Sequence, residues 1–304
     1  MELSRRRMLG SVAAVLTARL EAARPKGYLV ENATHMFAAD QGRFPYHPSG
    51  TYRPPPSTVE NYSQFAREAK IDHTVIVQSE VYQDDHRYLE YCFQHEPSPG
   101  FFKGTCLFDP IDPKTPARIQ ELVGRLDSRI VGIRIHEFRG AGAPPTTTGP
   151  MRDRDLLSDA MKNTWRKMSD LGLLIQMQTV PCHAPQIGAL AAQFREMPVL
   201  IDHLAFPARG TAAEYEEVLK LSKIPRVYMK VSTLTEKDKP LVRRLYDAYG
   251  PDRLVWGSYG TSLPAFEKAL KLADFIFDYA SEEDRMKIRG LNAMKLFRFP
   301  LSKA

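Results

Sequence analysis

The sequence is poor in cysteine, and its three cysteines, Cys92, Cys106 and Cys182, are isolated from one another. Because none of them forms a C-x-x-C pair, the sequence predicts neither a zinc knuckle nor a disulfide framework. Long apolar runs are also missing. No segment reaches the roughly 18 uninterrupted apolar residues that cross a bilayer, so we expect no membrane span.

The sequence also lacks a concentrated basic stripe, although its formal net charge is +6. Lysine and arginine are scattered along the chain, whereas proteins that bind nucleic acids usually cluster these residues on one face. We therefore expect no nucleic-acid partner. We interpret the excess of positive charge as a feature of a cavity mouth that attracts a carboxylated small molecule.

The N-terminus carries three consecutive arginines at positions 5–7, a short run of small and apolar residues over 8–18, and Ala23 shortly before Pro25. This order resembles a twin-arginine export signal. It predicts a leader over residues 1–25 and a periplasmic or secreted protein. The alternative is a basic N-terminal helix on a cytoplasmic protein. In either case, residues 26–304 are expected to form one domain.

Short β-rich runs alternate with amphipathic stretches along this domain. The eight strand candidates are residues 28–36, 74–78, 101–107, 130–136, 173–179, 199–203, 227–232 and 254–257. Eight repeated βα units predict an α/β fold, a single (β/α)₈ TIM barrel, with an additional C-terminal helix over 282–291. An open doubly wound sheet would place a glycine-rich turn after its first strand, and none is present.

Polar side chains close most of these strand candidates, at the barrel end where active sites form. They are His35, Gln78, Ser79, Arg134, His136, Gln176, Gln178, His203, Lys230, Ser232 and Tyr259. His203 and Arg134 stand out because each directly follows a buried apolar run. For every one of these residues, the alternative is a rim side chain that is satisfied by hydrogen bonds and has no functional role.

Several stretches of the chain resemble the amidohydrolase-related family, and within it the 2-pyrone-4,6-dicarboxylate lactonase group. They include Arg43-Phe-Pro-Tyr46, Gly132-Ile-Arg134, Ile201-Asp-His203, Asp252-Arg-Leu-Val-Trp-Gly-Ser258 and Asn292-Ala-Met-Lys-Leu-Phe297. Together they span nearly the whole chain after the leader. The resemblance implies the same barrel fold and hydrolysis of a carboxylated lactone.

The chain departs from the family pattern at two positions. The family opens with a His-x-His pair on the first strand, whereas we read Ala33 and His35 at those positions. The family also ends its eighth strand with Gly-Ser-Asp, whose aspartate activates water or binds metal, and this chain has Tyr259 instead. A catalytic zinc needs three protein ligands. A divalent metal is therefore disfavoured, and we expect no cofactor.

The resemblance also implies roles for the remaining side chains. His35 and His203 are expected to donate hydrogen bonds to a developing oxyanion, while Gln78, Ser79 and Arg134 hold acid groups of the substrate. Tyr46 is expected to line the mouth of the cavity. Three further polar residues, Gln176, Gln178 and Lys230, are expected to bind substrate.

A neutral phenol is a poor base at neutral pH, so Tyr259 does not replace the aspartate directly. The preferred hypothesis is a metal-independent hydrolase of a lactone or ester that uses His136 or His203 as base. The second is a lyase or isomerase in which Tyr259 and the histidines act as acid and base. The third is a ligand-binding barrel that has lost catalysis. The oligomeric state and the identity of the substrate stay open.

Export can be checked directly. We expect the protein recovered from the periplasm of an expressing bacterium to begin near residue 24, because the signal is removed after export. Edman sequencing or intact mass measurement of the fractionated protein decides the matter. A protein that stays in the cytoplasm, or that still begins at Met1 after export, contradicts the assignment.

Overall fold

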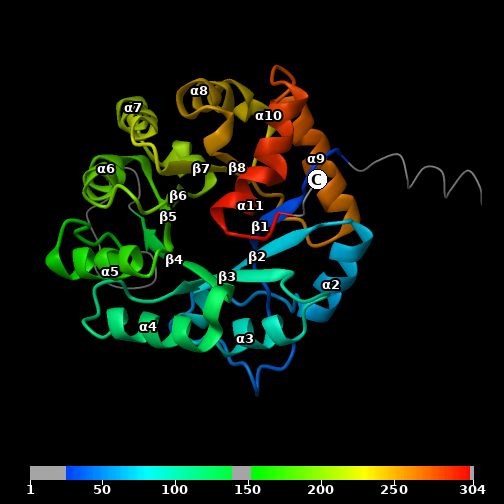
Figure 1. The fold of residues 1–304 in the computed structure, drawn as a ribbon, viewed down its shortest axis with the longest axis vertical. Helices are drawn as coiled ribbons and strands as arrows, with labels where there is room; N and C mark the ends of the chain where they lie inside the picture. Colours follow the sequence, from blue (N-terminus) through cyan, green and yellow to red (C-terminus); the bar gives the residue numbers. More distant parts are fainter. Residues whose placement is uncertain (1–24, 139–151, 302–304) are drawn as a thin grey trace, which may run out of the picture.

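The computed structural model describes residues 25–138 and 152–301. It contains one eight-stranded parallel sheet whose strands neighbour one another in chain order, and Figure 1 shows them curling into a barrel. The strands are β1 (Val30–Thr34), β2 (His73–Val77), β3 (Phe102–Leu107), β4 (Ile130–Glu137), β5 (Leu174–Thr179), β6 (Val199–Ile201), β7 (Val227–Val231) and β8 (Leu254–Trp256). The predicted TIM-barrel fold is confirmed.

Helices follow the strands and surround the sheet (Figure 1). They are α2 (Val59–Glu68), α3 (Arg87–Gln94), α4 (Thr115–Leu126), α5 (Asp159–Asp170), α6 (Ala184–Gln193), α7 (Ala212–Lys220), α8 (Lys239–Tyr249), α9 (Leu263–Ile276), α10 (Glu282–Met286) and α11 (Asn292–Leu296). Among the described residues, no helix is long and apolar enough to cross a membrane. The expected leader lies outside the described residues apart from its last position.

Local sequence accounts for where these elements begin. The helices α2, α5, α7 and α10 follow Thr58, Ser158, Thr211 and Ser281, whose hydroxyls accept a hydrogen bond from a backbone N–H of the first turn. Such caps satisfy donors that have no partner within the helix. The strand residues are nearly all buried, because the sheet is covered on its outer face by helices and filled on its inner face.

The C-terminal helical region is longer than the sequence predicted. A π-helical turn, Lys287–Leu291, follows α10 and leads into α11. Gly290 lies in this turn against the backbone of Tyr28, so closely that a Cβ atom at this position would overlap the Tyr28 carbonyl oxygen. The glycine that interrupts the helical pattern in the sequence is therefore a packing contact rather than a helix end.

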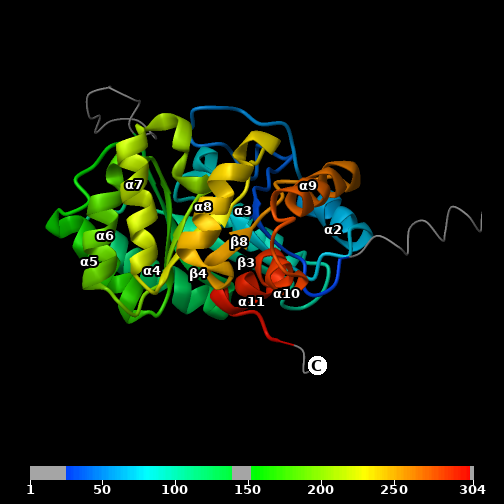
Figure 2. The same cartoon turned by 90° about the horizontal axis from the view of Figure 1, so that it is seen from above.

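The α11 helix closes the end of the barrel where the strands begin. Figure 2 shows α10 and α11 at the opposite end of the barrel from the blue loop that follows β1. One hydrophobic cluster joins strand residues such as Val75, Leu174 and Leu200 to Met294 and Phe297 of the C-terminal region. The lower half of the barrel is therefore packed with apolar side chains, and only the upper end is left for a polar site.

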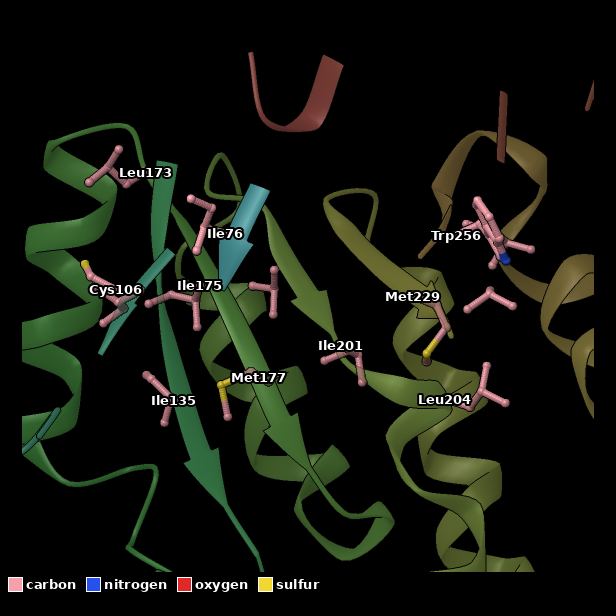
Figure 3. Packing of buried hydrophobic residues seen from close by; sticks show 14 of the residues in the cluster. Ile76, Cys106, Ile135, Leu173, Ile175, Met177, Ile201, Leu204, Met229 and Trp256 are labelled. Atoms are coloured by element: carbon pink, nitrogen blue, oxygen red, sulfur yellow. The ribbon is translucent and has the colours of Figure 1, made fainter. Parts of the chain in front are cut away.

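A second and larger cluster fills the space between the strands and the surrounding helices. Figure 3 shows part of it, with Ile135, Ile175, Met177 and Ile201 beside one another on neighbouring strands. These residues alternate along each strand with side chains that face the inside of the barrel. The alternation explains how Arg134 and Gln176 come to face inward, since their neighbours in sequence face the helices.

The two ends of the sheet, β1 and β8, meet through side chains. Within the described residues no backbone ladder joins these strands. The amide of Asn32 instead donates to the Trp256 carbonyl oxygen at 2.6 Å, and the carboxylate of Glu31 accepts from the Ser258 backbone N–H at 2.8 Å. Side-chain hydrogen bonds thus take the place of strand pairing at this seam.

The contact of Gly290 with Tyr28 can be tested by substitution. We expect Gly290→Ala to lower the free energy of unfolding by about 3 kcal/mol, because the added methyl group forces the C-terminal turn away from β1. The matched control is Gly124→Ala on α4, where a Cβ meets nothing within 4 Å. That change should stabilise by up to about 1 kcal/mol through helix propensity. Urea denaturation of both variants measures the difference, and equal stabilities would contradict the packing role.

Candidate active site

A buried carboxylate lies at the centre of the barrel, directly after β6. Asp202 accepts hydrogen bonds from Nε of Arg134 at 2.8 Å and from Nε2 of Gln176 at 2.9 Å, and its other oxygen lies 3.1 Å from Nζ of Lys230. Burial alone would raise the pKa of Asp202, but the two cations together hold that pKa well below its usual range. Asp202 is therefore ionised at neutral pH.

The two cations of this cluster, Arg134 and Lys230, come from different strands of the barrel. Arg134 on β4 is opposite Gln176 on β5 in the sheet register, and both point toward Asp202. Lys230 on β7 also donates to the Asn32 carbonyl oxygen on β1 at 2.7 Å. Burial lowers the pKa of Lys230, while the charge of Asp202 opposes that shift. The cluster thus ties together strands from opposite sides of the barrel.

His203 follows Asp202 and is fixed by two hydrogen bonds. Its Nε2 lies 3.3 Å from Nη2 of Arg134, and its Nδ1 lies 2.8 Å from the Ser232 hydroxyl. Because a guanidinium only donates, Nε2 accepts and Nδ1 carries the proton. Burial lowers the pKa of His203 to about 3. The charge of Asp202 opposes this shift, and the charge of Arg134 adds to it. The imidazole is neutral at neutral pH.

The backbone around His203 is unusual. His203, Leu204, Ala205 and Phe206 all have positive φ angles, between 49° and 58°. Non-glycine residues rarely adopt such angles, and a strained run at a strand end is characteristic of functional sites. The bend turns the chain back over the barrel mouth and places the His203 ring 5.6 Å from the Tyr259 ring, measured between centroids.

His35 is paired with Tyr259, the residue that we expect, from the sequence, in place of the family aspartate. Nδ1 of His35 lies 2.7 Å from the Val77 carbonyl oxygen and therefore carries the proton, so Nε2 accepts from the Tyr259 hydroxyl at 3.0 Å. Burial, helped by the nearby charge of Arg134, lowers the pKa of His35 to about 4. Burial of the hydroxyl raises the pKa of Tyr259. Both groups are neutral, and the phenol is the donor.

His136, on β4, differs from the other two histidines. Its Nε2 is buried and has no hydrogen-bond partner within the described part of the chain. Burial, followed by the charge of Arg134, lowers the pKa of His136 well below its usual value. The ring is therefore neutral at pH 7. Of the three histidines at the site, this one has a buried ring nitrogen without a hydrogen-bond partner among the described residues.

These groups surround a cavity of about 420 Å³ at the carboxyl ends of the strands. Its lining residues are His35, Phe37, Thr51, Tyr52, Ser79, Glu80, Arg134, His136, Gln178 and Tyr259. A smaller cavity of about 170 Å³ adjoins it and shares three of these residues, Glu80, Arg134 and His136. Arg152 and Arg154 line the smaller cavity. The site therefore combines arginines, neutral imidazoles and aromatic rings.

Six of the residues singled out from the sequence line the larger cavity, namely His35, Ser79, Arg134, His136, Gln178 and Tyr259. His203 lies behind them, between Arg134 and Ser232. The Ser79 hydroxyl is 2.7 Å from the Tyr52 hydroxyl, and both residues line the larger cavity.

Four other expected substrate-binding residues lie outside both cavities. Gln78 donates to backbone carbonyl oxygens of the following loop, and Tyr46 donates to the Pro54 carbonyl oxygen at 3.0 Å. Gln176 and Lys230 are buried beneath the cavity, where they bind Asp202. Their polarity serves the protein interior, because a buried carboxylate needs such partners.

Sequence reasoning missed the contribution of the loop after β1. Phe37, Thr51 and Tyr52 reach the cavity from this loop, and Glu80 reaches it from the turn after β2. Phe37 also bears on the missing family histidine. Two residues lie two positions from His35, one on each side. Phe37 lines the cavity, whereas Ala33 packs against Gly257 at the seam between β1 and β8. Phe37 therefore contributes to the cavity, and Ala33, the position read as that of the missing histidine, does not line it.

The fold and the site define a barrel with its polar chemistry at the carboxyl ends of the strands, as in hydrolases of this architecture. The chain belongs to the amidohydrolase family, whose family model matches residues 32–299.

Three relatives are similar to this chain in sequence or structure. L-Fucono-1,5-lactonase of Burkholderia ambifaria is 27% identical over 201 residues, which are 62% of this chain and 64% of that protein. A probable 2-pyrone-4,6-dicarboxylic acid hydrolase of Acinetobacter baumannii, with citric acid bound, has a TM-score of 0.70 at 20% identity, covering 89% of this chain and 99% of that one. A Burkholderia multivorans amidohydrolase with bound zinc has a TM-score of 0.65 at 14% identity, covering 90% and 100%.

The side chains at this site do not match the donor set of a zinc centre. No three His, Cys, Asp or Glu side chains come together as metal ligands within residues 25–138 and 152–301. Nε2 of His35 already accepts from Tyr259, and Nε2 of His203 faces the guanidinium of Arg134. A divalent cation between these rings would be repelled by the arginine and would lack a third ligand.

The burial of neutral histidines makes stability depend on pH. His203 has a lower pKa in the folded protein than in the unfolded chain, so its contribution is present above about pH 6.5 and is lost as the pH falls toward 3. We expect the free energy of unfolding to drop by up to about 1.4 kcal/mol per pH unit from this residue below pH 6. Urea denaturation between pH 7.5 and 5 should show a shallower drop in His203→Gln than in the parent. His95→Gln, at an exposed position, is the control and should keep the parent's drop. A parent-like drop in His203→Gln would contradict the assignment.

Proposed function

We propose that this protein is a metal-independent hydrolase that opens a lactone or ester bond in a small carboxylated molecule. The observation that carries this proposal is the convergence of Arg134, Tyr259 and His136 on one cavity, with a neutral His136 ring whose Nε2 has no hydrogen-bond partner among the described residues. A cation, a hydroxyl donor and a base are the three groups that acyl transfer to water requires.

The relatives support the same class of substrate. The Burkholderia ambifaria relative is a lactonase, and the Acinetobacter baumannii structure is of a probable hydrolase of a pyrone dicarboxylic acid, with citric acid bound. In this chain, Arg134 is placed to bind a substrate carboxylate or carbonyl oxygen, because its guanidinium lines both cavities. Planar guanidinium groups bind such oxygens through two parallel hydrogen bonds.

The proposed reaction begins when His136 takes a proton from a water molecule that attacks the carbonyl carbon. The carbonyl oxygen gains negative charge, which Arg134 and the Tyr259 hydroxyl stabilise once the phenol has turned from His35 to the substrate. Donors that are already in place at a buried site stabilise such an oxyanion strongly. The C–O bond then breaks, and the leaving oxygen receives the proton that His136 holds.

The low pKa of His136 keeps its ring unprotonated at neutral pH, which a base requires. Its basicity is recovered during the reaction, since the negative oxyanion forms next to the imidazolium. The rings of Phe37 and Tyr52 lie 6.4 Å apart between centroids, in a T-shaped arrangement on the cavity wall. This wall is suited to a substrate with a flat apolar ring.

The test uses protein that has been treated with chelator and assayed with a panel of carboxylated lactones and aryl esters in ¹⁸O-labelled water. We expect turnover that survives chelation and puts one labelled oxygen into the new carboxylate. His136→Gln should lower kcat about 100-fold or more, as is typical for loss of a general base. His95→Gln, which changes an exposed histidine, is the matched control.

Three outcomes would contradict the proposal. Product without labelled oxygen would indicate lyase or isomerase chemistry, for which Tyr259 is then the acid. Activity that disappears with chelation and returns with zinc would show a metal enzyme. Full activity in His136→Gln would move the base to another group, of which Glu80 on the cavity wall is the first to test.

A further inference from the structure

The backbone at Tyr259 requires a restraint. Tyr259 has a φ of +62°, in the left-handed region that non-glycine residues rarely occupy. It lies in the loop after β8, and its residue is 38% exposed, so packing alone does not fix it. Its hydroxyl nevertheless reaches Nε2 of His35 at 3.0 Å. The surrounding hydrogen bonds must therefore supply the restraint.

The carboxylate of Glu31 lies beneath this loop and is almost fully buried. One oxygen accepts from the backbone N–H groups of Asn32 at 3.0 Å and Ala33 at 2.8 Å. The other oxygen accepts from the Ser258 backbone N–H at 2.8 Å and from the Ser258 hydroxyl. Each oxygen of Glu31 therefore has two donors, one pair on β1 and one pair at the end of β8.

The Ser258 hydroxyl binds the chain on both sides of Tyr259. It donates to Glu31, and its oxygen accepts from the Gly260 backbone N–H at 2.8 Å. Tyr259 is thus the middle residue of a short loop whose flanking residues are both tied to one hydroxyl. That hydroxyl is in turn tied to a buried carboxylate on β1, the strand that His35 directly follows.

We propose that Glu31, acting through Ser258, is a positioning residue that holds Tyr259 in its left-handed conformation over His35. Its carboxylate spans the seam between β1 and β8, where strand pairing is replaced by side chains. The catalytic consequence rests on the function proposed above, because it requires Tyr259 to act on the substrate. The positioning itself is a property of the fold.

Glu31 also contributes to the charge around the phenol. Burial is the largest cause of the raised pKa of Tyr259, and the negative charges of Asp202 and Glu31 add to it while Arg134 opposes it. The other titratable groups near the phenol are His35, His203 and Tyr52. Removing the charge of Glu31 should therefore lower the pKa of Tyr259.

The experiment follows Tyr259 by NMR in full-length protein labelled with ¹³C at the tyrosine ζ carbon, with the signal assigned by its loss in Tyr259→Phe. In Glu31→Gln, we expect the Tyr259 signal to shift or broaden at neutral pH and its titration to begin at lower pH than in the parent. Ser258→Ala should also shift or broaden the signal. With a lactone substrate, both variants should lower kcat about tenfold while KM changes less than about twofold, because a transition-state donor is misplaced.

Glu216→Gln, which changes an exposed glutamate on α7, is the control and should leave the Tyr259 signal unchanged. If Glu31→Gln does not fold, Ser258→Ala decides the question, since it keeps the carboxylate and removes only the hydroxyl. A parent-like Tyr259 signal in folded Ser258→Ala overturns the proposal. The NMR readout needs no turnover, so a protein that hydrolyses nothing but shows the shifts would contradict the proposed function and leave the positioning role supported.

Discussion

The whole interior of this barrel is organised around one buried carboxylate. Asp202 is completely enclosed, and an ionised group in such a place is stable only when cations and hydrogen-bond donors surround it. Arg134, Gln176 and Lys230 supply them from three different strands. Asp202 fixes the guanidinium of Arg134 through Nε. Nη2 of the same guanidinium then orients His203, and the rest of the group faces the cavity. The position of this arginine at the cavity is thus a consequence of the buried ion cluster.

This arrangement also sets the protonation of the histidines. His35, His136 and His203 are buried around the positive charge of Arg134, so each has a pKa well below that of a free imidazole. Neutral rings can accept protons or hydrogen bonds at neutral pH. The Tyr259 phenol, with a raised pKa, is the complementary donor. The site therefore pairs neutral acceptors with one fixed cation.

The strand order and most of the cavity wall were predictable from the sequence, because both follow from local patterns. Arg134 and His136 alternate with apolar neighbours and end a strand, so their direction and their place in a barrel are determined by the pleat. The same rule placed Gln176 and Lys230 inside the barrel but could not separate the buried layer from the cavity above it. Whether an inward side chain is buried or reaches the cavity depends on how far the apolar cluster at the lower end of the barrel extends. That cluster includes residues of α11, which are far away in the sequence.

The sequence by itself determined the eight βα units and the family, since these follow from periodicity and short motifs. Tertiary structure alone decided that Phe37 lines the cavity, that Nε2 of His136 has no hydrogen-bond partner among residues 25–138 and 152–301, and that Glu31 reaches Ser258 across the seam. Those facts join residues that are far apart in the chain. Their contacts depend on loop conformation and on the closure of the sheet, which are fixed by the sum of many distant interactions rather than by any local pattern.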